Sequence, residues 1–151
     1  MTDLRDFIAA RLDEDEQIAR NASSPVPVGA DRETWSYDRE GFAVRASHGR
    51  WNVATRRDDP ADAREIHMTD SYGQHIARHD PARVLREVAA KRRVMERHSA
   101  DPTYTPVDRW YCLGCGNDDM GPLSEIEDCP ELRDLAAPYS DHPDYRQEWA
   151  A

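Results

Sequence analysis

The chain has 151 residues, about a third of them charged, and a formal net charge of −10 at pH 7. This length suits one domain with a single core. No stretch approaches the roughly 20 consecutive apolar residues that span a bilayer, so the sequence predicts a soluble protein without a membrane helix. The acidic excess repels phosphate backbones and argues against general nucleic-acid binding.

The N-terminal segment, residues 1–20, is predicted to form an amphipathic helix over 3–20. Thr2 is placed to cap its first turn, and Arg11 and Asp15 can pair on its inner face. The segment lacks the basic start and apolar block of a secretion signal, which predicts a cytoplasmic protein. Apolar residues recur at helical spacing: Leu4, Phe7, Ile8, Leu12, Ile18 and Ala19.

A small antiparallel sheet is predicted within residues 31–70, after a proline-bearing connector at 21–30. Gly41 and Gly49 stand where hairpin turns need a positive φ. The run EIHMTD, residues 65–70, predicts a fourth strand at the sheet edge. Apolar and polar residues alternate in three short runs, whose apolar members are Trp35 and Tyr37, then Phe42, Val44 and Ala46, then Trp51 and Val53.

A second helix is predicted over residues 80–98, with Asp80 as its N-cap and Pro81 at its first position. Val84, Leu85, Val88 and Met95 share one face of it. Residues 78–98 carry seven basic and three acidic side chains, whereas residues 112–151 carry two basic and ten acidic ones. The basic helix therefore either balances the acidic C-terminal part as a solvated face or docks a partner.

The three cysteines of the chain predict a metal site in the segment 99–151. Cys112 and Cys115 form a CxxC pair, and Cys129 follows after thirteen intervening residues, directly before Pro130. A CxxC turn lets two thiolates meet one tetrahedral ion, and a thiolate at a helix start is favoured by the helix dipole. Because a reducing cytoplasm disfavours disulfides and three is an odd number, we expect zinc rather than a disulfide.

The fourth zinc ligand is predicted to be His98, which is separated from Cys112 by thirteen intervening residues. His142, Asp128 or a water molecule remain as alternatives. A site with four protein ligands is closed and serves a structural role more often than a catalytic one. Two other interpretations of the cysteines remain. They could form a thioredoxin-type redox pair, although the turn-forming run after Cys115 argues against it, or they could be buried core residues that bind no metal.

A second histidine pair, His75 and His79, stands four residues apart in GQHIARHDP. On a helix these two side chains could face one metal, with Asp80 or His67 nearby, which leaves a metal-dependent hydrolase as an alternative function. No HExxH motif supports it, and Pro81 biases Asp80 away from helical geometry. The sequence contains no phosphate-binding glycine loop and no signature of a serine or cysteine triad, so no catalytic residue is predicted.

Three stretches, RLDEDEQIAR, HIARHDPARVLREVAAKRR and CPELRDLAAPYSDHPDYRQEW, together resemble a family of small uncharacterised proteins from actinobacteria and their phages. The resemblance implies no activity and no catalytic residues. It agrees with the use of 19 arginines and one lysine, which is typical of a GC-rich genome.

Together these patterns predict one α+β domain over residues 1–151, with a small antiparallel sheet, amphipathic helices and a zinc-stapled C-terminal segment that ends in short helices. The predicted role is that of a non-enzymatic accessory protein that binds another protein. A zinc-bearing nucleic-acid binder that uses the arginine-rich helix is the remaining alternative.

Overall fold

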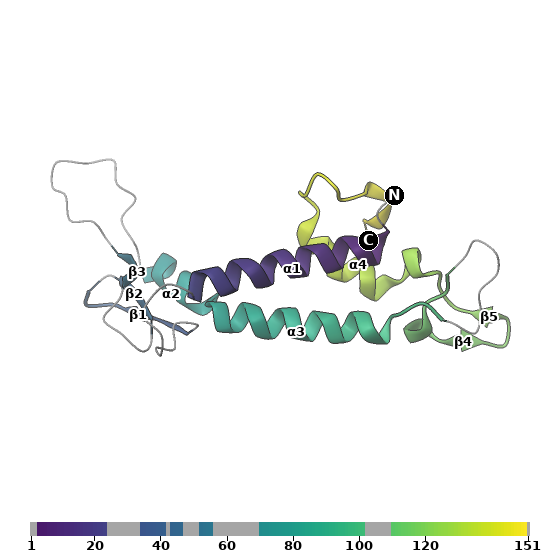
Figure 1. The fold of residues 1–151 in the computed structure, drawn as a ribbon, viewed down its shortest axis with the longest axis horizontal. Coiled ribbons are helices and arrows are strands. Elements are labelled where there is room, and N and C mark those ends of the chain that lie inside the picture. The colour runs from purple at the N-terminus through teal and green to yellow at the C-terminus, as the bar shows by residue number, and fades with distance from the viewer. Residues whose placement is uncertain are drawn as a thin grey trace. The chain divides into compact units, whose positions relative to one another are not determined.

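The computed structural model describes residues 3–23, 34–41, 43–46, 52–55, 70–101 and 110–150. These ranges contain four α-helices and an antiparallel three-stranded sheet, which confirms the predicted α+β class (Figure 1). They form two compact units, Met1–Glu14 with Val88–Ala151 (unit 1) and Asp15–Glu87 (unit 2). The single domain over 1–151 stays a prediction. None of the helices within the described ranges is both long and apolar enough to cross a bilayer.

Helix α1, Leu4–Ser23, begins at an aspartate cap. The Asp3 carboxylate accepts a hydrogen bond from the Asp6 backbone N–H at 2.8 Å, whereas Thr2 lies outside the described residues. The helix extends three residues into the predicted connector, since the Ser23 hydroxyl bonds to the Ala19 carbonyl at 3.1 Å. Arg11, predicted to pair with Asp15, lies 3.5 Å from the Glu14 carboxylate.

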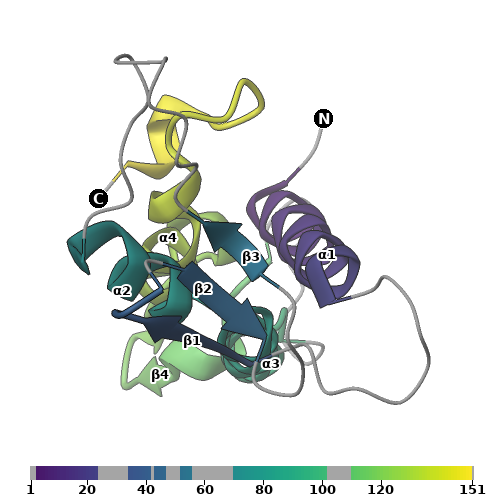
Figure 2. The same cartoon turned by 90° about the vertical axis from the view of Figure 1, so that its left-hand side faces the viewer.

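The sheet of unit 2 has the predicted antiparallel order β1-β2-β3, as Figure 2 shows. Its strands are β1 (Trp35–Asp38), β2 (Ala43–Ala46) and β3 (Asn52–Thr55). The Asp38 carboxylate accepts the backbone N–H groups of Glu40 and Gly41 in the β1–β2 turn. Phe42, Gly49, Trp51 and the predicted fourth strand up to residue 69 lie outside the described residues, and Asp70 begins a helix instead.

Helix α2, Asp70–Arg78, packs on β1 through Tyr37. The Tyr37 hydroxyl donates to the Asp70 carboxylate at 2.9 Å, and Arg39 pairs with the same carboxylate at 2.6 Å. The hydrogen bond from Arg39 has the larger effect and the one from Tyr37 the smaller, and together they hold the pKa of Asp70 below its usual value of 3.8. Asp70 thus ties the start of α2 to β1.

Helix α3, Pro81–Arg97, begins as predicted. The Asp80 carboxylate accepts the Arg83 backbone N–H at 2.7 Å, which confirms Asp80 as the cap, and its second oxygen accepts the Trp35 N–H. Of the predicted inner face, Val88 and Met95 are buried.

Unit 1 packs the first part of α1 against the second part of α3, and the two run side by side in opposite directions (Figure 1). Arg92 pairs with Asp13 at 2.6 Å, and Arg5 donates to the Met95 carbonyl at 3.3 Å. The remaining elements of unit 1 are η1 (Leu113–Cys115), β4 (Asn117–Asp118), β5 (Gly121–Pro122), η2 (Ile126–Asp128), α4 (Pro130–Ala136), η3 (Ala137–Tyr139) and η4 (Gln147–Trp149).

An aromatic cluster joins α1 to the C-terminal turns of unit 1. The Phe7 ring lies 5.0 Å from the Trp149 ring and 5.9 Å from the Tyr145 ring. Glu127 completes this junction, because one of its carboxylate oxygens accepts the Leu4 backbone N–H and the other accepts the Trp149 indole N–H. The start of α1 and the C-terminal segment therefore share one buried core.

Candidate metal centre

The four predicted ligands come from three neighbouring elements of unit 1. His98 directly follows α3, and its backbone N–H bonds to the Val94 carbonyl at 3.0 Å, so the last turn of the helix aims the ring. Cys112 precedes η1 and Cys115 ends it. Cys129 is the N-cap residue of α4, as the sequence predicted from Pro130. Each of the four candidate ligands thus lies in or directly beside a helical element.

Backbone hydrogen bonds bring these elements together across long stretches of sequence. The Leu113 N–H donates to the Ser99 carbonyl at 2.8 Å, which sets η1 beside the end of α3. The Cys112 N–H donates to the Ser124 carbonyl at 3.0 Å, which sets η1 beside the segment that leads into η2 and α4. Cys112 is therefore held close both to His98 and to the segment that leads to Cys129.

The candidate ligand atoms, His98 Nδ1 and the three cysteine Sγ atoms, all lie within 4.8 Å of one another. Nδ1 is 3.4 Å from the Sγ atoms of Cys112 and Cys129 and 4.0 Å from that of Cys115. Cys129 Sγ is 3.6 Å from each of the other two sulfur atoms. Among the residues that the structure describes, this is the one cluster of three or more His, Cys, Asp or Glu side chains arranged to hold a metal ion.

These separations fit a tetrahedral zinc ion. With Zn–S bonds of about 2.3 Å and a Zn–N bond of about 2.0 Å, tetrahedral angles separate two sulfur atoms by about 3.8 Å and a sulfur from a nitrogen by about 3.5 Å. The three thiols are free, with no disulfide among them. A site with soft thiolate and imidazole donors binds zinc in preference to harder cations.

Two glycines permit the CxxC turn, one through its small size and the other through its backbone conformation. A Cβ on Gly114 would lie 2.6 Å from both the Arg97 carbonyl oxygen and His98 Nδ1, closer than real Cβ atoms come to other heavy atoms. Gly116, directly after Cys115, has φ 77°, a conformation that L side chains rarely adopt. The sequence CLGCG thus permits both the close approach to His98 and the reversal of the chain after Cys115.

Burial shapes the chemistry of the donors. Cys112 and Cys129 are 1% and 0% exposed and His98 is 9% exposed, whereas Cys115 is half-buried. Burial raises the pKa values of the Cys115 and Cys129 thiols above the ordinary value for cysteine, because low-dielectric surroundings destabilise the charged thiolate. A bound divalent cation reverses this preference, since it stabilises thiolates and displaces their protons.

Glu131 is a fifth group at the centre that the sequence did not predict. Its Oε2 lies 3.6 Å from Cys129 Sγ and 3.8 Å from both Cys115 Sγ and His98 Nδ1. A hydrogen bond from its own backbone N–H lowers the pKa of the Glu131 carboxyl, so the group is an anion at neutral pH. The sequence did contain a signal for Glu131: it lies in the first turn of the helix that begins at Cys129, and acidic residues are favoured at helix N-termini.

The alternative fourth ligands lie elsewhere in unit 1. His142 contacts the Arg11 guanidinium, and its ring lies 5.8 Å from the Phe7 ring, so it belongs to the packing around α1. Asp128 pairs with Arg133 of α4. Of the donors considered from the sequence, His98 is the one whose ring nitrogen lies among the three sulfur atoms.

The histidine pair of the alternative hydrolase site lies on and just after α2, in unit 2. The His75 and His79 rings are 4.4 Å apart, and His79 Nδ1 lies 3.0 Å from the His75 backbone carbonyl oxygen. No third His, Cys, Asp or Glu from the described ranges completes a metal site with them. His67 lies outside the described residues.

Comparison with known proteins yields a family and no described activity. No curated protein and no solved structure matches the chain. A model built for a family of unknown function, DUF6221, matches residues 1–151. The match includes every residue of the candidate metal centre, and the chain belongs to this family.

Proposed function

We propose that the protein is a zinc-stabilised, non-enzymatic accessory protein of the cytoplasm that acts by binding another protein. The observation that carries the proposal is the cluster of His98 Nδ1 and three cysteine Sγ atoms within 4.8 Å of one another. The high ratio of arginine to lysine supports an actinobacterial or phage genome as its source.

A structural role for zinc follows from the number of ligands. Four protein donors complete a tetrahedral shell and leave no position for a substrate or a reactive water molecule. The segment that carries Cys112, Cys115 and Cys129 contains short strands and single helical turns with few apolar residues to bury. A metal that joins this segment to the end of α3 would contribute its binding free energy directly to folding.

A protein partner is favoured over a nucleic acid by the charges. The net charge of −10 repels phosphates at long range. Two of the cations on α3 already have partners, since Arg92 pairs with Asp13 and Arg83 pairs with Glu87. Arg93 and Arg97 are exposed, and they suit an acidic surface of a partner protein.

The metal part of the proposal is tested on the full chain purified without added metal. Native mass spectrometry and elemental analysis should give one zinc per chain, and X-ray absorption should fit three sulfur donors and one nitrogen donor. His98→Ala should change the shell to three sulfur donors, whereas His142→Ala should leave it unchanged. Folded protein free of metal, or equal X-ray absorption spectra for the two variants, would refute a metal centre with His98 as the fourth ligand.

The partner is sought by affinity capture with the zinc-loaded protein, followed by reconstitution with each purified candidate. A stoichiometric complex that survives nuclease treatment supports the proposal. A complex that is lost on nuclease treatment would favour the nucleic-acid alternative instead.

A further inference from the structure

A cavity of about 490 Å³ lies in unit 1 between the first turns of α1, the last turn of α3 and the chain around Trp110 and η2. It is separate from the metal centre, because no metal-centre ligand lines it. Its volume is within the range of about 300–1,000 Å³ that is typical of ligand sites.

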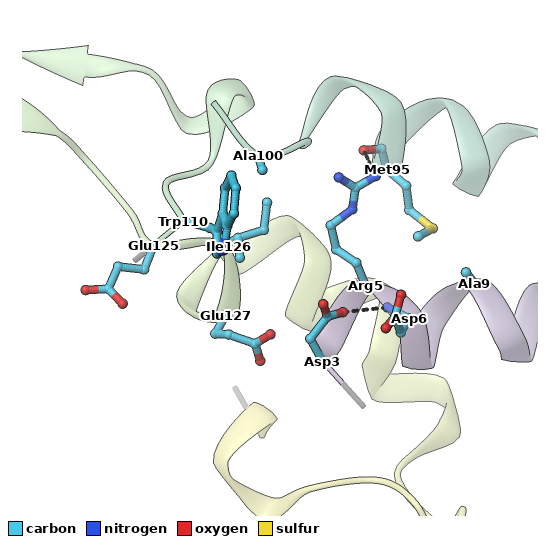
Figure 3. A pocket seen from close by; sticks show the side chains of 10 residues that line it. All are labelled: Asp3, Arg5, Asp6, Ala9, Met95, Ala100, Trp110, Glu125, Ile126 and Glu127. Atoms are coloured by element: carbon cyan, nitrogen blue, oxygen red, sulfur yellow. Dashed lines mark hydrogen bonds between the residues drawn. The ribbon is translucent and has the colours of Figure 1, made fainter. Parts of the chain in front are cut away.

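One part of the cavity wall is apolar. Trp110, Ile126, Met95, Ala100 and Ala9 contribute it, and Figure 3 shows the Trp110 ring beside Ile126, with Met95 across the cavity. Trp110 is 56% exposed, whereas Ile126 beside it and Met95 across the cavity are buried. An indole face left open beside a buried apolar floor is a typical docking element of interaction sites.

The rest of the wall is acidic. Asp3, Asp6, Glu125 and Glu127 line it, against a single cation, Arg5, which already donates to the Met95 carbonyl. Two of the acids have structural tasks, since Asp3 caps α1 and Glu127 bonds to Leu4 and Trp149.

The Asp6 carboxylate, by contrast, is exposed, and no hydrogen bond or ion pair links it to another residue of the described ranges. The cavity therefore joins an open indole to an excess of negative charge, a combination that attracts an organic cation and repels an anion.

We propose that this cavity binds an exposed segment of a partner protein through a Lys or Arg side chain that is flanked by an apolar residue. The cation would lie against the Trp110 ring and near Asp6, and the apolar neighbour would cover Met95 and Ile126. The cavity is larger than one side chain, so it has room for both. The inference rests on the proposed function only in assigning a protein as the partner.

The metal centre supports one wall of this cavity. The Ile126 N–H donates to the Trp110 carbonyl at 2.7 Å, and Tyr111 pairs with Glu125 as an isolated β-bridge. Cys112 follows directly in the chain and holds the Ser124 carbonyl through its own N–H. Zinc at Cys112 and Cys129 would therefore keep Trp110 and Glu125 in place, so removal of zinc should weaken binding at the cavity.

The test uses a display library of random peptides of about twelve residues, selected on the zinc-loaded full-length protein in near-physiological salt. The expected result is enrichment of Lys or Arg next to Leu, Met or an aromatic residue. Affinities of the best synthetic peptide are then measured by fluorescence polarisation. We expect Trp110→Ala to weaken binding about tenfold or more and Asp6→Asn about threefold, whereas Asp119→Asn, the same charge change on an exposed turn, should have no effect.

Each outcome decides the proposal. Absence of basic enrichment, or equal affinity of the parent, Trp110→Ala and Asp6→Asn for a basic peptide, would overturn it. Self-association of the protein that is lost in Trp110→Ala would assign the cavity to a second copy and also overturn it.

Zinc content is measured in every variant, which separates this inference from the metal centre. If the chain holds one zinc and no peptide is selected, only the proposed role of the cavity is refuted. Selective peptide binding by a chain that holds no zinc refutes the metal centre alone.

Discussion

Gly114 lies so close to His98 that a Cβ on the glycine would be 2.6 Å from the Nδ1 atom of the imidazole. This nitrogen is the atom that faces the three sulfur atoms. Any side chain at position 114 must therefore displace the CxxC turn, the ring, or both.

Gly114→Ala should lower zinc affinity by about tenfold or more, because a misplaced imidazole removes one of four donors from the tetrahedral shell. Competition with a chromophoric chelator measures the loss. Leu113→Ala is the matched control, since the neighbouring Leu113 side chain is 53% exposed and lies outside the shell. Equal zinc affinity in the two variants would contradict the geometry of His98.

Cys112→Ser should loosen the C-terminal segment while the sheet and α2 of unit 2 keep their protection. Structural zinc contributes on the order of 10 kcal/mol in zinc-finger peptides, and a missing thiolate removes much of it. Hydrogen exchange is expected to rise over residues 110–150 in the variant, and chelation of zinc from the parent should reproduce the pattern. Met120→Ala, at a residue 94% exposed, is the control. Unchanged exchange in both the variant and the chelated parent would mean that metal does not hold this segment.

Glu127→Gln should destabilise unit 1 by about 1–3 kcal/mol, because the substitution replaces one of the two accepting carboxylate oxygens with an NH2 group, which cannot accept the N–H group bound there. The two donors to this carboxylate are the Leu4 backbone and the Trp149 indole. Urea unfolding followed by tryptophan fluorescence measures the change. Glu148→Gln, which affects only an exposed pair with Arg146, should cost less than about 0.5 kcal/mol. A similar small effect in both variants would show that Glu127 does not join the two segments.

The contact between Asp70 and Tyr37 should make the packing of α2 on β1 sensitive to acid. The folded-state pKa of Asp70 is lowered, chiefly by the hydrogen bond from Arg39. Its stabilising effect is therefore fully present above the unfolded-state pKa of about 4 and is lost as the pH falls through the lower folded-state value. Hydrogen exchange of α2 amides, compared over this window in the parent and in Asp70→Asn, measures it. The variant should lack this part of the pH dependence, and identical profiles would contradict the assignment.

The protein should not retain duplex DNA at submicromolar concentration in about 150 mM salt, because charge screening beyond about 8 Å leaves only local cations to act against an acidic chain. Mobility-shift and filter-binding assays measure this. If retention is observed, the variant Arg93→Ala/Arg97→Ala tests its source. Loss of binding in that variant would establish the nucleic-acid alternative for α3.

Local signals in the sequence were sufficient for α1, the three-stranded sheet and α3, although not for α2, and they identified the four candidate metal ligands that the structure brings together. The aspartate and proline at positions 80 and 81 determined where α3 begins, since capping and the fixed φ of proline act within one turn. The CxxC turn and the cysteine before Pro130 predicted the three thiols, because ligand spacing is a property of short segments. At the end of α1 the local prediction was wrong by three residues, where the Ser23 hydroxyl bonds back to the helix.

Only the tertiary structure decided which groups meet across long stretches of chain. It brought His98, rather than His142, among the sulfur atoms, because the backbone of Leu113 pairs with that of Ser99 while His142 contacts Arg11. It also brought the first turns of α1 and the chain around Trp110 together to form an acidic cavity, whereas Glu131 reaches the candidate metal centre locally, two residues after Cys129. The physical reason is that spacing along the chain limits where a side chain can reach, whereas the choice among reachable partners depends on how the helices and turns of unit 1 bury their apolar faces together.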